Sequence, residues 1–120
     1  MTCVAKYDFS IPQGTDLSVP FRLKDSEGVP VRLEGFSVRM QLRRFVTASD
    51  VIDALSTDNG RVTLDDNGGG FSLSFPNAVT ERFPSGYLVY DIELVSPDDL
   101  VTRIVEGKIR VTAEVTRGEV

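Results

Sequence analysis

The segment that decides the fold is FSVRMQLR, residues 36–43, in which apolar and polar side chains alternate at every position. A period of two places successive side chains on opposite faces of an extended chain, so the segment predicts a strand with one buried face. Arg39, Gln41 and Arg43 then share the outer, polar face of that strand. This is the longest clean alternation in the first half of the chain.

The same alternation recurs along the chain, and turn residues interrupt it at short intervals, which is typical of an all-β sandwich or barrel. Pro20 and Pro30 cannot donate to a strand ladder, so each predicts an edge strand or a bulge. Residues 51–55 fit a short strand or a helical turn equally well. Gly107 predicts a bulge or bend within the last strand. Besides residues 36–43, the expected strands are residues 7–11, 17–23, 29–33, 61–64, 71–75, 87–95 and 100–115.

One helix is expected at residues 77–83, with Asn77 as its N-cap and Pro84-Ser85-Gly86 ending it after about two turns. This order of elements predicts an immunoglobulin-like β-sandwich of about seven to nine antiparallel strands, with the helix before the penultimate strand. The pair Gly86-Tyr87 resembles the corner that enters that strand in such domains. The sequence has neither the cysteine pair nor the tryptophan of the antibody core, and a small β-barrel is the alternative fold.

The length of 120 residues predicts a single domain over residues 1–120, with residues 116–120 as a frayed tail. Hydrophobic residues at 41% and charged residues at 26% are typical of a soluble globular domain. With no histidine, and with Cys3 as its single cysteine, the chain lacks the commonest general base and the usual zinc ligands. We therefore expect no enzymatic activity, no catalytic residue, no metal and no cofactor.

Charge and segment composition bear on partners and location. The formal net charge of −5 opposes binding to nucleic acid, which normally requires a strongly basic face. No apolar run approaches the length of a membrane span, and the N-terminus does not have the pattern of a secretory signal. One free cysteine agrees with a reducing compartment, so we expect synthesis in a cytoplasm and no nucleic-acid or membrane partner.

Two acidic clusters have a chemical and a structural interpretation. Asp65-Asp66-Asn67-Gly68 offers oxygen ligands to a calcium ion, but it does not have the ligand spacing of an EF-hand and also fits a plain hairpin turn. Asp91 and Glu93 share one strand face and could flank a glycosidic bond, although a solvated sheet face explains them too. Ser72 and Ser74 have no histidine to activate them, which excludes a Ser-His-Asp triad.

The arginine stripe, defined as Arg39, Gln41 and Arg43, is the candidate partner-binding site. Arginine forms forked hydrogen bonds to carboxylates and stacks on aromatic rings, which makes it the usual cation of protein interfaces. A solvated outer face is the other interpretation. The two differ in their consequence, because only a docking stripe would be required for assembly.

Four stretches carry a family resemblance: residues 11–14 (IPQG), 23–43, 83–94 (FPSGYLVYDIEL) and 103–111 (RIVEGKIRV). Together they resemble the small all-β virion proteins of tailed bacteriophages, including the N-terminal attachment domain of baseplate upper proteins. The resemblance implies a non-enzymatic structural or adaptor protein of the tail, baseplate or head-to-tail region. It further implies a protein made in the host bacterial cytoplasm, located in the virion in several copies and joining larger virion proteins. A carbohydrate- or receptor-binding sandwich is the alternative, although few aromatic side chains lie outside core positions.

Overall fold

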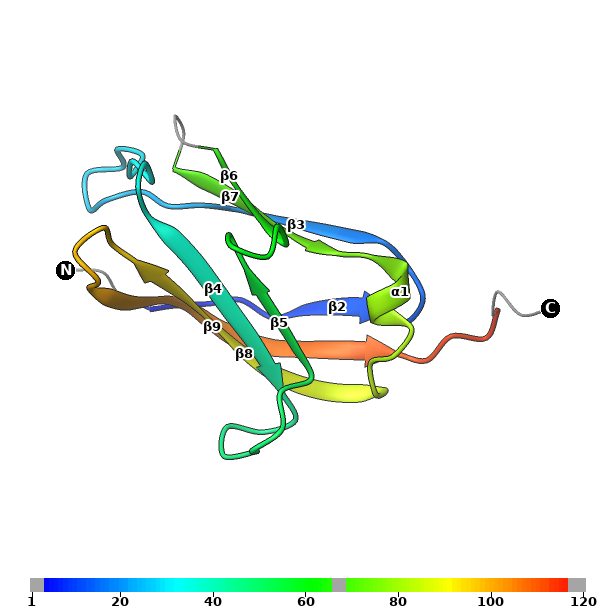
Figure 1. Cartoon of the computed structure of the whole chain (residues 1–120). Helices are drawn as coiled ribbons and strands as arrows, with labels where there is room; N and C mark the ends of the chain where they lie inside the picture. Colours follow the sequence, from blue (N-terminus) through cyan, green and yellow to red (C-terminus); the bar gives the residue numbers. More distant parts are fainter. Residues whose placement is uncertain (1–3, 66–68, 117–120) are drawn as a thin grey trace.

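Two β-sheets pack face to face in the computed structural model, which describes residues 4–65 and 69–116 (Figure 1). Within these residues there are nine strands and one short helix. They are β1 (Ala5–Lys6), β2 (Phe9–Pro12), β3 (Leu17–Arg22), β4 (Ser37–Arg43), β5 (Asp53–Ser56), β6 (Val62–Asp65), β7 (Gly70–Phe75), α1 (Asn77–Thr80), β8 (Gly86–Val95) and β9 (Val101–Thr112). No helix in the described ranges is long and apolar enough to cross a membrane.

The larger sheet has the order β1-β9-β8-β4-β5, with β2 also pairing with β9, and the smaller sheet has the order β3-β7-β6. The strands thus form two separate sheets, and the last two strands of the chain, β8 and β9, lie side by side near the centre of the larger sheet. This is the arrangement of an immunoglobulin-like sandwich. The predicted fold class is therefore confirmed, and the barrel alternative is wrong. One detail differs, because β1 and β2 both run parallel to β9, so the strands are not all antiparallel.

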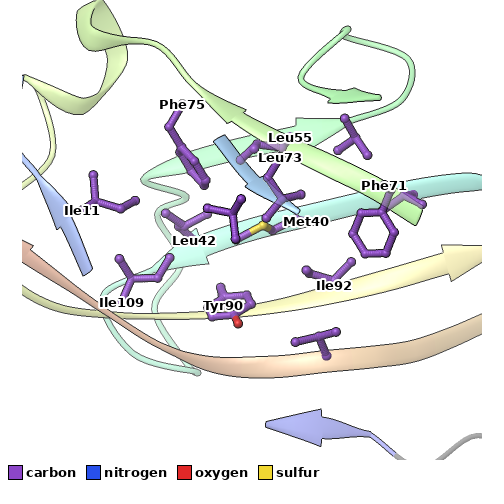
Figure 2. Close-up of a cluster of buried hydrophobic side chains, with 14 of the residues drawn as sticks. Ile11, Met40, Leu42, Leu55, Phe71, Leu73, Phe75, Tyr90, Ile92 and Ile109 are labelled. Carbon is purple, nitrogen blue, oxygen red and sulfur yellow. The ribbon is translucent and has the colours of Figure 1, made fainter. Parts of the chain in front are cut away.

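The core lies between the two sheets and is built from the apolar side of each alternating segment. Figure 2 shows Met40 and Leu42 of β4 beside Leu73 and Phe75 of the facing sheet. The alternation in β4 is therefore confirmed: its apolar side chains are buried, and its polar side chains lie outside. The other fully buried large side chains are Ile11, Leu33, Val38, Leu55, Phe71, Leu88, Ile92 and Ile109.

The two prolines have different outcomes. Pro20 lies in β3, the edge strand of the smaller sheet, as predicted. Pro30 does not lie in a strand, because residues 29–33 contribute only an isolated bridge between Pro30 and Lys24. The turn that precedes it explains this, since Asp25 Oδ1 accepts the backbone N–H groups of Glu27 and Val29 and so competes with a ladder. Of the ambiguous residues 51–55, the last three lie in the strand β5.

The helix is shorter than predicted, and Asn77 is its first residue rather than its N-cap. Pro76 takes the cap position without a side-chain hydrogen bond, while Asp16 Oδ1 accepts the Asn77 backbone N–H at 2.7 Å from a distant part of the chain. Beyond α1, the backbone N–H groups of Arg82 and Phe83 donate to carbonyls three residues earlier. This tightening into a 3₁₀-type turn ends the α-helix before Pro84-Ser85-Gly86.

Gly107 lies in a regular part of β9, so the prediction of a bulge at Gly107 is wrong. The register shift occurs where Ile92 pairs with Val105 and the next residue of β8 pairs with Arg103, which leaves Ile104 without a partner. Gly107 is instead the point where the backbone between β1 and β2 crosses closest to β9. A Cβ atom at Gly107 would lie 2.0 Å from the carbonyl oxygen of Tyr7. The glycine therefore permits a close backbone approach.

Some predictions fall on residues that the structure does not describe. Cys3 lies outside the described residues, and so does the predicted tail after Thr116. In the acidic loop, residues 66–68 also lie outside them, although β6 and β7 pair antiparallel on either side with Asp65 opposite Gly70. The predicted hairpin is therefore present as a strand pairing.

Candidate interaction face

The outer face of the larger sheet carries a broad open groove of about 870 Å³. Strand register builds it, because Arg39, Gln41 and Arg43 of β4 lie opposite Glu93, Asp91 and Val89 of β8. On the other side of β8, Asp91 and Val89 lie opposite Glu106 and Lys108 of β9. The groove is lined by Lys6, Asp8, Arg39, Met40, Gln41, Arg43, Val46, Val89, Tyr90, Asp91, Glu93, Arg103, Glu106, Gly107 and Lys108.

An ion network occupies the middle of this face. Arg39 Nε lies 2.8 Å from Glu93 Oε1, and Arg103 Nε lies 3.4 Å from Asp91 Oδ2. Arg103 also reaches Glu106 Oε1 at 3.5 Å. These side chains are partly exposed, so each pair contributes only about 0–1 kcal/mol to stability. Their main effect is on the surface potential, because the three carboxylates exceed the two guanidinium groups by one negative charge.

At one end of the face the cations have no carboxylate partner. Arg43 donates to the backbone carbonyl of Ala48 and to Gln41 Oε1, both at 2.8 Å. Lys108 is exposed, and its backbone N–H, rather than its ammonium group, donates to Asp8 Oδ1 at 2.8 Å. Among residues 4–65 and 69–116, no carboxylate lies within ion-pair distance of Arg43 or Lys108.

Exposed apolar side chains lie on the same strands as these two cations or in the loop after β4. Val46, in the loop after β4, is 83% exposed and lines the groove together with half-buried Val89. Tyr87 is 65% exposed and lies two residues before Val89 in β8. Phe45, also in the loop after β4, is 57% exposed. We define the basic–apolar patch as Arg43, Phe45, Val46, Tyr87, Val89 and Lys108.

The residues of the predicted arginine stripe thus lie together on one face, but their surroundings differ. Arg39, Gln41 and Arg43 all line the groove. Arg39, however, is engaged by Glu93 in the ion network, whereas Arg43 lies in the basic–apolar patch. Sequence reasoning missed Lys108, which lies across β8 from Arg43. The alternation of Lys108 with Ile109 indicates that Lys108 faces outward. Only the pairing of β9 with β8 brings it into the same groove as Arg43.

Tyr90 connects the groove to the core. Its hydroxyl donates to the backbone carbonyl of Tyr7. Burial, together with the nearby charge of Asp8 and the neighbouring Tyr7, raises the pKa of Tyr90 well above its usual range. Tyr90 is therefore a neutral hydrogen-bond donor at physiological pH. Tyr87 does not form the expected corner, since its position in β8 turns its side chain to solvent.

Of the two acidic clusters, residues 66–68 of the first lie outside the described residues, and only the second is fully described. Within residues 4–65 and 69–116, no group of three or more Cys, Asp or Glu residues could hold a metal ion. Asp91 and Glu93, considered above as a carboxylate pair, are each held by an arginine. The face therefore presents paired charges beside exposed apolar side chains.

Comparisons with known proteins add little to this description. No family model matches the chain, and no curated protein matches it. Among solved structures, the chain is similar to the extracellular domains 3–5 of Drosophila OTK, with 12% sequence identity and a TM-score of 0.35. That match covers 90% of this chain and 33% of the OTK chain. The chain thus spans about a third of the length of the chain in that structure.

Proposed function

We propose that this chain is a non-enzymatic structural or adaptor domain that joins larger proteins through the outer face of its larger sheet. The observation that carries the proposal is the groove on that face, where the ion network lies beside the basic–apolar patch. Protein interfaces combine apolar and arginine contacts in their centre with polar groups around them. This face has both components on adjacent strands.

The same features make a sugar-binding site the weaker interpretation. Sugar recognition needs flat aromatic side chains beside polar groups, and most phenylalanines here pack in or against the core. The groove lining contains one aromatic residue, Tyr90, and its hydroxyl is already bonded to the backbone.

The more specific part of the proposal is a place in the virion of a tailed phage, in the tail, baseplate or head-to-tail region. The support for it is the sequence resemblance described above, and a β-sandwich of this size is compatible with such a role. Immunogold electron microscopy of particles from cells that carry the gene tests it. Gold at the tail, neck or capsid is expected. Unlabelled particles from cells that express the protein would refute a virion role.

A paired variant tests the docking face in the same particles. Arg39→Glu with Arg43→Glu reverses the charge of the arginine stripe, and we expect a folded protein that is absent from particles. The matched control is Arg32→Glu with Arg82→Glu, which makes the same change of charge at exposed residues outside the groove. Equal incorporation of both double variants would contradict docking through this face.

A further inference from the structure

We propose that copies of this chain associate head to tail, with the turn between β8 and β9 of one copy docking on the basic–apolar patch of the next. The turn, residues 97–101 (PDDLV), is called the acidic tip below. The inference rests on the proposed role of the outer face in protein docking. It names a second copy of this chain as an occupant of that face.

The acidic tip presents charge and apolar surface side by side. Asp98 and Asp99 are exposed, and neither carboxylate has an ion-pair partner within the residues that the structure describes. Directly after them, Leu100 is 68% exposed and Val101 is 50% exposed. Two carboxylates are thus followed at once by two apolar side chains that face water.

The basic–apolar patch is the complement of this tip. Arg43 and Lys108 lie on opposite sides of Val89, in the register row that crosses β4, β8 and β9. Because neighbouring strands are about 4.8 Å apart, the two residues flank Val89 over about 10 Å. An apolar side chain seated on Val89 would therefore have a cation on either side for its adjacent carboxylates. Opposite charge across an interface favours this pairing over others.

The acidic tip is held in one conformation before any partner arrives. Ser96 Oγ accepts the backbone N–H of Asp98 at 3.2 Å and that of Leu100 at 3.0 Å. The Ser96 backbone N–H donates to the Leu100 carbonyl at 2.9 Å. Asp99 has a φ of 64°, a left-handed conformation that aspartate tolerates better than most residues. Such a preformed turn loses little conformational entropy on binding.

The tip and the patch of one copy cannot meet each other. The patch lies at the start of β8, at Tyr87 and Val89, whereas the acidic tip follows the end of the same strand (Figure 1). At about 3.3 Å per residue, the strand separates them by roughly 20–30 Å. The contact therefore forms only between copies. Because it joins two different surfaces, it generates rings or filaments rather than a closed symmetric dimer.

The ion network argues against a polyanion as the occupant of the patch. Its carboxylates, Asp91, Glu93 and Glu106, lie next to the patch along β8 and β9. A nucleic-acid backbone or an anionic membrane would extend over them and be repelled. A short acidic turn fits on the two cations without reaching the network.

Sedimentation velocity of the whole chain at concentrations up to about 1 mM tests the proposal, since one turn on one patch makes a small and weak contact. We expect the average mass to rise above 13.2 kDa with concentration. The rise should disappear at about 1 M salt, where the screening length falls to about 3 Å. Two variants disable one surface each. Asp98→Lys with Asp99→Asn changes the tip and keeps a residue suited to the left-handed conformation, and Arg43→Glu with Lys108→Glu changes the patch.

Each variant alone should stay monomeric, and an equimolar mixture should associate again. In the mixture the unchanged acidic tip of the patch variant meets the unchanged patch of the tip variant, and the basic tip of the tip variant meets the acidic patch. Lys108→Glu alone serves if the double change at the patch impairs folding. Three results would overturn the proposal: a monomer at every concentration, association that survives in the tip variant, or a mixture that stays monomeric. Failure here leaves the particle-labelling test of the proposed function unaffected, because that test does not depend on self-association.

Discussion

Replacing Gly107 with alanine should destabilise the fold far more than a strand glycine normally does. The new Cβ would lie 2.0 Å from the Tyr7 carbonyl oxygen and 2.9 Å from Asp8 Oδ1. The backbone at Tyr7 and Asp8 must then move away from β9. Three hydrogen bonds depend on its position: Tyr7 N–H to the Glu106 carbonyl, Tyr90 hydroxyl to the Tyr7 carbonyl, and Lys108 N–H to Asp8 Oδ1.

At about 1 kcal/mol for each hydrogen bond, Gly107→Ala should lower the free energy of unfolding by about 3 kcal/mol. For a chain of 120 residues this corresponds to a fall in Tm of about 12 °C. Urea unfolding followed by circular dichroism measures the difference, with an unchanged slope m as evidence that the two-state transition persists.

Gly70→Ala is the matched control, because Gly70 also lies in a strand but its Cβ would meet the nearest atom at 3.4 Å. We expect a change of no more than about 1 kcal/mol there. In a double-mutant cycle with Tyr90→Phe, the loss from Gly107→Ala should shrink, since both changes remove the same hydrogen bond. A Gly107→Ala loss equal to the Gly70→Ala loss would refute the argument from close approach.

Three further predictions follow from contacts of the described residues. The raised pKa of Tyr90 means that the folded state keeps the phenol proton above pH 10.0, the pKa of an unfolded tyrosine. The free energy of unfolding should therefore fall as pH rises past 10, and it should fall less in Tyr90→Phe. Urea unfolding midpoints measured across this pH range check both expectations. Arg61→Ala should lower the free energy of unfolding by about 3 kcal/mol, because the Asp53 side chain is only 11% exposed and loses its ion-pair partner at 2.7 Å. A melting temperature within 2–3 °C of wild type, roughly 0.5 kcal/mol, would show that the pair is unimportant for stability. Asn59→Ala should lower the free energy of unfolding by about 2 kcal/mol, because the Asn59 carboxamide bonds the Ser56 backbone N–H and the Ala54 carbonyl at the free edge of β5. Exposing that edge should also promote concentration-dependent aggregation in light scattering, and a soluble variant of full stability would contradict this reasoning.

The alternation of side chains was sufficient to predict most strands and the shared face of the arginine stripe. Both follow from local geometry, because a period of two assigns each side chain to one face whatever its neighbours are. Leu88, Tyr90 and Ile92 are buried for this reason, and Asp91 faces the groove. The same logic could not assign a direction of pairing, so the parallel contacts of β1 and β2 with β9 were missed.

The remaining errors concern contacts between residues far apart in the chain. Asp16 accepts the first helical N–H at Asn77, which nothing in the local sequence indicates. The glycine at position 107 indicates a bulge from the sequence alone, yet the reason for it is the close approach of the Tyr7 backbone, a hundred positions earlier. The division of the arginine stripe has the same origin, since Glu93 reaches Arg39 only through the pairing of β4 with β8.

The edges of the sandwich explain why association should use side chains rather than added strands. At the free edge of β5, Asn59 Oδ1 accepts the Ser56 backbone N–H at 3.0 Å, and Asn59 Nδ2 donates to the Ala54 carbonyl at 3.1 Å. The carboxamide thus occupies the positions that a further strand would take. At the edge of the smaller sheet, Pro20 removes a donor from β3. The edges at β5 and β3 therefore disfavour pairing with a further strand, while β6 and the side of β1 and β2 form the other edges. The proposed contact between copies uses exposed charge and apolar surface instead. A contact of that kind is sensitive to salt, which the sedimentation experiment at about 1 M salt measures.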